Sequence, residues 1–289
     1  DAVAFLEAQF GSYSDRMRGL ATRAVAERWI DAGPRPGKVG GAFCTWLVGD
    51  QSRILMNFSP TYDAVSTLAH ELGHAYHNLN EAGLTPLQRE TPMTLAETAS
   101  TFCETIVKEA ALCDADEMEQ LFIIEQSLQG ACQVVVDIVS RFDFERAVFA
   151  VRPERELSIG DFNRLMRDAQ LGTYGDALDP NHLHPYMWAV KGHYYIPGFS
   201  FYNYPYLFGL LFGLGLYARY RAEPAAFITR YDQLLASTGQ ADAADLAARF
   251  GIDIRSPAFW TASLDVIRAD VDRFAALVDR LGDQAATAE

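Results

Sequence analysis

The sequence predicts one mainly α-helical domain with a small β element. The 289 residues are 49% hydrophobic and 21% charged, with a mean hydropathy near zero, which is typical of a soluble globular chain long enough to bury a core. Most segments after residue 91 carry apolar residues at helical spacing, and the clearest β-prone segments are 42–48 and 53–58. No internal repeat, low-complexity tract or linker divides the chain, so we expect 1–289 to form a single domain.

The charge balance and the cysteines exclude several classes of protein. Asp and Glu total 38 against 24 for Lys and Arg, a formal net charge of −14, so we expect no nucleic-acid partner. The four scattered cysteines fit neither a disulfide framework nor a CxxC metal site, which favours reduced thiols and a cytoplasmic protein. Between Lys191 and Arg219 there is no charged residue, but Asn203, Pro205 and tyrosine hydroxyls interrupt this run. We therefore expect a buried helix here and no membrane partner.

The elements follow in order along the chain. Residues 1–31 predict a helix with an apolar face, which ends at the Gly- and Pro-rich segment 33–37. Residues 42–48 and 53–58 flank a turn and predict a hairpin, in which we expect 53–58 to be the edge strand. A helix is then predicted from Ser59-Pro60-Thr61 to about Leu79, followed by helices at 92–112, 116–150, 158–169, 201–221, 224–237, 241–249 and 257–281.

The segment His70-Glu71-Leu72-Gly73-His74 carries the strongest chemical signal. On a helix, residues four apart differ by about 40° around the axis, so His70 and His74 share one face and can bind a single Zn²⁺. Glu71 is turned by about 100° from His70 and can act as a base toward a water on the metal. Chance matches to this spacing number on the order of 0.01 per chain, so a zinc-protease arrangement is favoured over an amphipathic helix with two unrelated histidines. Three other histidines are expected to be structural or exposed: His77, His182 and His184.

A catalytic zinc takes three protein ligands, so a third ligand is expected outside this motif. The best candidate is Glu97. The alternative is a capping box in which Thr94 and Glu97 begin a helix, but Thr91-Pro92 is the better helix start and would place Glu97 in the second turn. Glu104 follows seven residues later on the same face, where it either orients a ligand imidazole or is a solvated helix glutamate.

Tyrosines cluster in residues 193–206, which hold five of the thirteen in the chain. A phenol or imidazole donor aimed at the oxyanion of amide hydrolysis lowers the barrier to that reaction. Tyrosines also pack well with their hydroxyls at a surface, so a structural interpretation of this cluster stays open.

Four segments in this order resemble one known family: Gly41–Cys44, Arg53–Phe58, Val65–His77 and Ala96–Glu104, with a looser match at 193–209. They are similar to the thimet-oligopeptidase-like zinc metallopeptidases, specifically to the oligoendopeptidase F branch. The resemblance covers most of the chain. It implies a largely helical, zincin-like metallopeptidase catalytic domain in which the small β element lies beside the HExxH helix.

The resemblance also implies the chemistry of the site. His70, His74 and Glu97 would bind one Zn²⁺ per chain, and Glu71 would be the catalytic base. The family cuts short peptides at internal bonds, and its narrow channel excludes folded proteins. Its full-length members carry a long N-terminal helical region, so the resemblance implies that 1–289 is a catalytic-domain fragment whose cleft the missing region completes.

The substrate-side residues of the family resemble His193 together with a tyrosine of the cluster. The segment Ile196-Pro197-Gly198 changes the usual spacing, so which tyrosine faces the scissile carbonyl stays open. Our order of preference is Tyr206, then Tyr202, then Tyr204. Two other functions stay open. One is a non-catalytic peptide-binding domain, and the other is an exopeptidase that releases terminal dipeptides.

Overall fold

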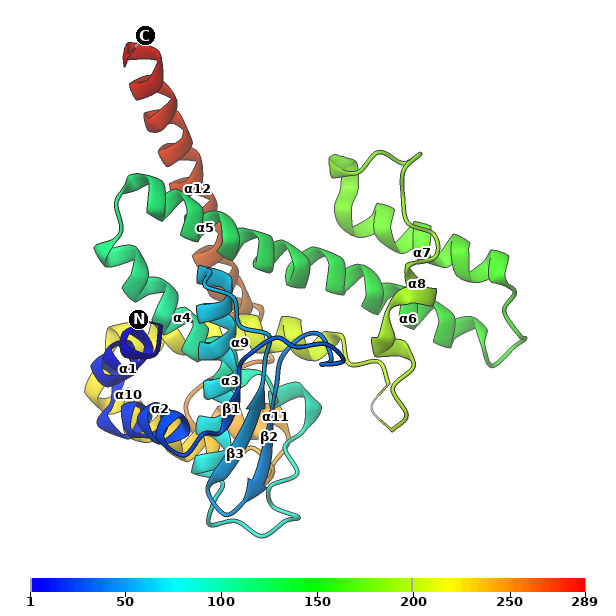
Figure 1. Cartoon of the computed structure of the whole chain (residues 1–289). Helices are drawn as coiled ribbons and strands as arrows, with labels where there is room; N and C mark the ends of the chain where they lie inside the picture. The colour runs from blue at the N-terminus through cyan, green and yellow to red at the C-terminus, as the bar shows by residue number, and fades with distance from the viewer. Residues whose placement is uncertain (1, 199, 289) are drawn as a thin grey trace. The chain divides into compact units, whose positions relative to one another are not determined.

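The computed structural model describes residues 2–198 and 200–288 and is mainly α-helical with one small sheet, as predicted (Figure 1). Residues 1, 199 and 289 lie outside the described residues. Residue 1 is the first residue of the predicted N-terminal helix. The chain forms two compact units, 1–128 with 209–289, and 129–208. The assignment of 1–289 to a single domain stays a prediction.

The first unit begins with two helices where the sequence predicted one. These are α1 (Ala2–Tyr13) and α2 (Asp15–Ala26), and Ser14 separates them. The Ser14 hydroxyl accepts a hydrogen bond from the Met17 amide at 3.1 Å, which is the usual role of an N-cap serine. The cap starts a new helix, and the predicted continuous helix over 1–31 is therefore wrong.

The predicted hairpin is confirmed, and the structure adds a third strand to it. Strands β2 (Phe43–Val48) and β3 (Gln51–Leu55) pair antiparallel, with Cys44 opposite Ile54. The two-residue strand β1 (Ile30–Asp31) pairs parallel to β3, so the sheet order is β1–β3–β2. Strand β3 lies in the centre of the sheet, and β2 and β1 are its two edge strands. Our expectation that 53–58 forms the edge strand is therefore wrong.

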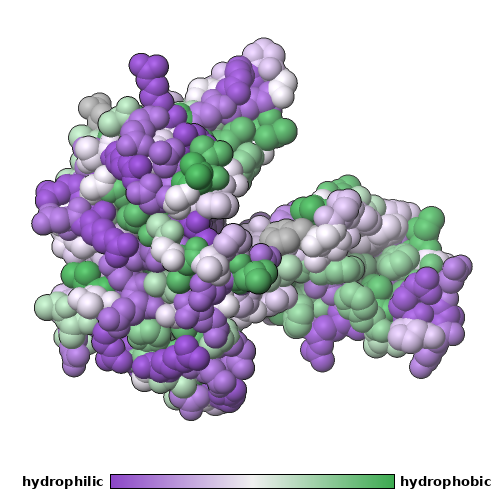
Figure 2. Space-filling model, turned by 90° about the horizontal axis from the view of Figure 1, so that it is seen from below, coloured by the Kyte–Doolittle hydropathy of each residue, from purple (hydrophilic) through white to green (hydrophobic). Residues whose placement is uncertain are grey.

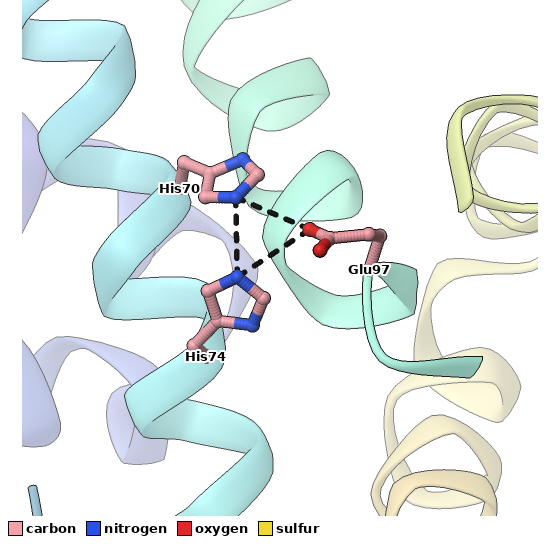
Figure 3. A group of neighbouring side chains, drawn as sticks. All are labelled: His70, His74 and Glu97. Atoms are coloured by element: carbon pink, nitrogen blue, oxygen red, sulfur yellow. Dashed lines mark hydrogen bonds and ion pairs between the residues drawn. The ribbon is translucent and has the colours of Figure 1, made fainter. Parts of the chain in front are cut away.

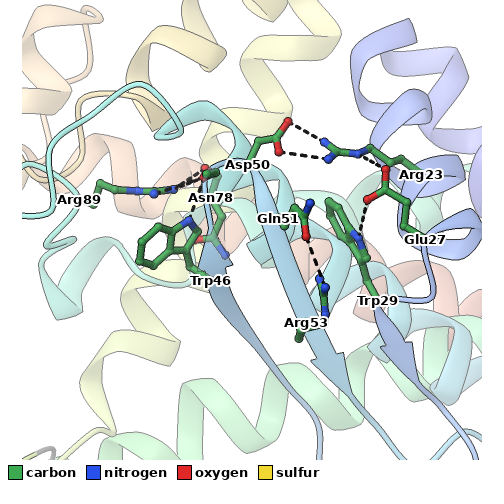
Figure 4. A network of polar contacts seen from close by, with 10 residues as sticks. Arg23, Glu27, Trp29, Trp46, Asp50, Gln51, Arg53, Asn78 and Arg89 are labelled. Carbon is green, nitrogen blue, oxygen red and sulfur yellow. Dashed lines mark hydrogen bonds and ion pairs between the residues drawn. The ribbon is translucent and has the colours of Figure 1, made fainter.

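Two arginines hold the β2–β3 turn (Figure 4). Arg23 on α2 donates to both carboxylate oxygens of Asp50, at 2.6 and 3.1 Å. Arg89 donates to the carbonyl of Gly49 at 3.3 and 3.4 Å and lies over the Trp46 ring, 4.2 Å from its centroid. Because these contacts come from two different segments, the β2–β3 turn is held against the rest of the unit.

Helix α3 (Tyr62–Asn80) carries the HExxH segment, and its start is confirmed by its cap. The Thr61 hydroxyl accepts from the Ala64 amide at 3.2 Å. The helix packs against β2 and β3 and against α4 (Thr98–Asp114), and Asn78 donates to the Ser52 hydroxyl at 3.0 Å. The apolar side of α3 lies in the core, where Leu68, Leu72 and Tyr76 are buried.

Two of the remaining helices of the first unit match the predicted segments to within a few residues. They are α10 (Pro224–Leu235) and α11 (Ala243–Arg249). Helix α12 (Pro257–Ala288) begins where predicted but extends seven residues beyond the predicted end at 281. The predicted helix over 92–112 is divided into the 3₁₀ turn η1 (Met93–Leu95) and α4. Helices α5 (Glu117–Cys132) and α9 (Tyr204–Ala222) each contribute residues to both units.

The second unit is built on a helix hairpin. The π-helical turn η2 (Gln133–Asp137) leads into α6 (Ile138–Val151), which packs against α7 (Ile159–Tyr174). Its core contains Phe144, Met166, Ala169 and Tyr194. The 3₁₀ turn η3 (Gly175–Ala177), α8 (Met187–Val190) and the 3₁₀ turn η4 (Gly192–Tyr194) lead to the start of α9.

Apolar side chains also reach the surface of the second unit, as Figure 2 shows for one face. Phe149, Ile159, Val190 and Tyr195 are exposed. Among the described residues, the continuous helix Glu117–Val151 is long and apolar enough to cross a membrane. A single such helix is weak evidence for a span, because core helices of soluble proteins meet the same criterion. The predicted buried character of α9 is seen over residues 211–216.

Candidate functional site

His70 and His74 lie one turn apart on α3 and point the same way (Figure 3). Their Nε2 atoms are 3.1 Å apart. The helical spacing of the HExxH segment therefore produces the paired imidazoles that the sequence predicted.

Glu97 reaches the same point from another segment. Its Oε2 atom lies 3.3 Å from His70 Nε2 and 3.4 Å from His74 Nε2 (Figure 3). Glu97 precedes the first residue of α4, and the preceding turn is η1, so the expected helix start at Thr91 and the placement of Glu97 in a second turn are wrong. Thr91 instead donates to the Glu81 carboxylate at 2.9 Å.

Two glycines allow these elements to approach, and the sequence analysis did not identify either role. A Cβ atom at Gly73 would lie 2.6 Å from the carbonyl oxygen of Ala99, so only glycine lets α3 contact α4 here. A Cβ atom at Gly209 would lie 2.3 Å from Cβ of Glu97. The signal in the sequence is a glycine inside a helical segment, which often has a packing reason.

The three ligand atoms fit a tetrahedral metal ion. An ion about 2.0–2.2 Å from each of three tetrahedral ligands requires ligand atoms roughly 3.3–3.6 Å apart, close to the separations observed. Two imidazoles and a carboxylate are also a donor set that zinc accepts. Glu71 is buried beside this group, and within the described part of the chain its Oε2 atom has no hydrogen-bond partner. A buried carboxylate oxygen without a partner suits a base that acts on a water.

The carboxylates set the electrostatics of the group. Burial alone would raise the pKa of Glu97, but hydrogen bonds from His70 and His74 hold it well below its usual range. Burial alone would lower the pKa of His70, but the carboxylates of Glu104 and Glu97 raise it well above its usual value. Burial is the main cause that raises the pKa of Glu71, which the neighbouring imidazoles oppose. A potential that favours positive charge on an imidazole also favours a cation between these groups.

Two further side chains contact the ligand candidates. Glu104 contacts Nδ1 of His70, as a residue that orients an imidazole must. The buried Ser100 hydroxyl lies 3.0 Å from Oε2 of Glu97 and can donate to it. Sequence reasoning missed Ser100, although its position three residues after Glu97 was a usable signal.

The predicted substrate-side residues form a separate cluster in the second unit. Tyr206 Oη lies 3.5 Å from His193 Nε2, and the Tyr202 and Tyr206 rings meet edge to face with centroids 5.1 Å apart. Tyr204 is exposed, and its ring centroid lies 6.4 Å from that of Phe142. Burial lowers the pKa of His193, so its imidazole is neutral at pH 7.

The three remaining histidines are structural or exposed, as expected. His77 is buried, with Nε2 2.8 Å from the Thr238 hydroxyl. His182 is exposed and contacts Asp179, and His184 is exposed.

Comparison with known proteins identifies relatives of this chain. Group B oligopeptidase PepB from Streptococcus agalactiae serotype III (strain NEM316) is 30% identical over 214 residues, which are 73% of this chain and 34% of that protein. Oligopeptidase PepF from Bacillus subtilis (strain 168) is 25% identical over 262 residues, 90% of this chain and 39% of that protein. The chain thus spans less than half the length of these curated relatives.

The fold is also found in solved structures. One from Chlamydophila abortus matches with a TM-score of 0.79 at 21% identity, covering 96% of this chain and 47% of that one. A sequence model described as peptidase family M3 matches residues 14–266, which is most of the chain. The chain therefore belongs to peptidase family M3 and is of its oligoendopeptidase F type.

Proposed function

We propose that this chain is the catalytic part of a zinc-dependent endopeptidase that hydrolyses internal bonds of short peptides. One observation carries the proposal: His70, His74 and Glu97 place three ligand atoms within 4.8 Å of one another beside the buried carboxylate of Glu71. Membership of peptidase family M3 and similarity to proteins named oligopeptidases support the same reaction class. Family membership extends the argument from a metal site to peptide hydrolysis.

Each side chain of the site has its own role in the proposed reaction. His70, His74 and Glu97 hold one Zn²⁺, and Glu104 orients the His70 ring through Nδ1. Zinc, when bound, would polarise the scissile carbonyl and activate a water. Glu71 takes the proton from the attacking water at Oε2 and delivers it to the leaving amine. Burial raises the pKa of Glu71, which favours its taking up the proton that it later donates.

His193 and Tyr206 are proposed to donate to the developing oxyanion, with Tyr202 supporting the Tyr206 ring. A neutral imidazole and a phenol are both donors, and their mutual contact at 3.5 Å places the two together. This role follows from the family resemblance and from the clustering of the side chains.

The peptide is proposed to pair along the free edge of β2 (Phe43–Val48) in place of the strand first expected. An edge strand offers unpaired amide and carbonyl groups to an extended peptide. Strand β2 packs against α3, so a paired peptide would run along the helix that carries Glu71.

Two further proposals concern the cellular location of the protein and the region that completes its cleft. We propose a cytoplasmic location because all four cysteines are free thiols. We also propose that a region found in the longer relatives completes the peptide cleft.

Zinc analysis and a quenched-peptide assay on the wild type and on Glu71→Gln test this function. The wild type should bind one zinc and cleave at internal bonds, which product masses would show. Glu71→Gln should keep zinc and lose nearly all turnover, because the amide cannot accept the proton. Zinc binding without cleavage would favour a peptide-binding domain, release of dipeptides would favour an exopeptidase, and near wild-type turnover in zinc-loaded Glu71→Gln would remove Glu71 as the base.

A further inference from the structure

A row of buried polar side chains follows one face of η2 and α6 in the second unit. Asp137, Arg141 and Glu145 are spaced four residues apart and are each 4–6% exposed. Arg141 forms an ion pair with Asp137. Burial of such groups is unfavourable unless each one has a partner, so the partner of Glu145 is informative.

Glu145 has an amide as its partner. The side-chain nitrogen of Asn203 donates to Oε1 of Glu145 at 2.5 Å, and Asn203 is fully buried. Burial raises the pKa of Glu145 to about 7, and the neighbouring groups are Arg141 on the same helix and Tyr194 from η4. The function proposed above uses neither Glu145 nor Asn203.

Asn203 lies in the loop that joins His193 to Tyr206. The backbone N–H of Asn203 donates to the Phe201 carbonyl at 2.9 Å. The backbone N–H of Phe201 donates in turn to the His193 carbonyl at 2.7 Å. The Tyr206 amide donates to the Asn203 carbonyl at 3.2 Å. These contacts connect Asn203 through the backbone to both side chains of the cluster.

The loop also contains a strained residue. Phe201 has φ = 65°, a left-handed conformation that is unfavourable for a residue with a Cβ atom. Such a conformation persists only where its surroundings hold it, and it is common at functional sites. Glu145 and Asn203 supply a buried anchor two residues from this strained position.

We propose that Glu145 and Asn203 are positioning residues that hold His193 and Tyr206 where these two side chains donate to the developing oxyanion. They act through the loop and do not touch the reacting atoms. The inference rests on the proposed function, in which His193 and Tyr206 donate to the oxyanion.

An exchange of the pair tests the inference. Asn203→Asp removes the donor and places two carboxylates together, so kcat should fall about 10–100-fold with KM little changed. Adding Glu145→Gln restores one donor and one acceptor in the reversed direction, and kcat should return to near the wild-type value. The assay is run at about pH 9, because two facing carboxyls share a proton at lower pH. Glu145→Gln alone keeps the acceptor and should stay near wild type.

Asn163→Asp is the matched control in the same unit. The Asn163 side chain accepts from Trp188 Nε1 at 2.8 Å, and a carboxylate can accept this bond equally well. This variant should keep the wild-type kcat. Zinc content should be the same in every variant, since all the metal-ligand candidates lie in the first unit.

NMR of ¹⁵N-histidine and ¹³C-tyrosine separates this inference from the proposed function. His193 and Tyr206 resonances should shift in Asn203→Asp and return in the exchanged pair, whether or not the protein cleaves peptides. A zinc-loaded wild type without peptidase activity would overturn the proposed function. The NMR resonances of His193 and Tyr206 would still test the positioning role of Glu145 and Asn203 in that case. Unchanged kcat and resonances in Asn203→Asp, or no recovery in the exchanged pair, would overturn the positioning role.

Discussion

Glu97 is held by contacts of its own before any metal binds. Ser100 can donate to the oxygen that faces the two imidazoles, and Gly209 packs against its Cβ atom. A carboxylate fixed in this way loses little conformational freedom on binding an ion, which favours binding. The metal site therefore depends on residues that are not ligands.

Zinc affinity should separate ligands from the residues that orient them. Glu97→Ala and His74→Ala each leave two protein ligands, so we expect zinc to be lost on dialysis. Glu104→Ala and Ser100→Ala keep three ligands and should lose about 10–100-fold in affinity. Competition with a chelator measures these differences. Wild-type zinc content in Glu97→Ala would mean that the third ligand lies elsewhere.

The tyrosines of the cluster should differ from one another in their effect on kcat. Tyr206→Phe removes the hydroxyl that lies against His193 and keeps the ring, so kcat should fall about 10²–10³-fold with KM little changed. Tyr204→Phe is the control, because Tyr204 is exposed and faces Phe142. Steady-state kinetics on both variants decide the matter. Full kcat in Tyr206→Phe would leave the cluster with a packing role.

At the scale of elements, glycines at the contact points allow α3, α4 and α9 to pack closely. Gly73 lets α3 contact the first turn of α4, and Gly209 and Gly213 let α9 contact the same region. The Thr101 hydroxyl donates to the Gly209 carbonyl at 2.9 Å, which fixes this contact further. Close backbone packing here sets the distance from Glu97 to the imidazoles.

Gly209→Ala should therefore weaken both the fold and the metal site. The added Cβ would lie 2.3 Å from Cβ of Glu97, so α9 or Glu97 must move. We expect a loss of about 1–3 kcal/mol in the free energy of unfolding and a lower zinc affinity. Gly172→Ala on α7 is the control, since a Cβ atom there has nothing within 4 Å and improves helix propensity. Equal melting temperature and zinc affinity in Gly209→Ala and wild type would contradict this.

At the scale of the whole molecule, the sequence predicted what local spacing determines. The start of α3 follows from its Thr61 cap, and the paired imidazoles follow from the helical repeat. The strand order depends on β1, a two-residue strand with no local signal of its own. Glu97 was identified as a ligand candidate, but its position before α4 depends on the close approach of Gly73 to Ala99 and of Gly209 to Glu97 itself. Contacts between distant segments, such as Asn203 with Glu145, leave no mark in local periodicity.

The stability of the whole molecule should depend on the buried His77. Burial lowers the pKa of His77 to about 4, from about 6.5 in the unfolded chain, so the imidazole is neutral in the folded protein at pH 7. It contacts the Thr238 hydroxyl, which also contacts Glu81 at 3.0 Å, and this network connects α3 to the segment after α10.

The sign of the pH effect follows from which state binds the proton first. As pH falls below about 6.5 the unfolded chain is protonated at His77 while the folded protein is not, so the free energy of unfolding decreases. The decrease should reach about 3 kcal/mol near pH 4 and then stop, because the folded imidazole is then protonated as well. Urea unfolding at a series of pH values measures it. His77→Gln removes the titrating group but keeps hydrogen bonding to Thr238, so its stability should fall less between pH 6.5 and 4. Parallel curves for His77→Gln and wild type would show that other groups cause the acid sensitivity.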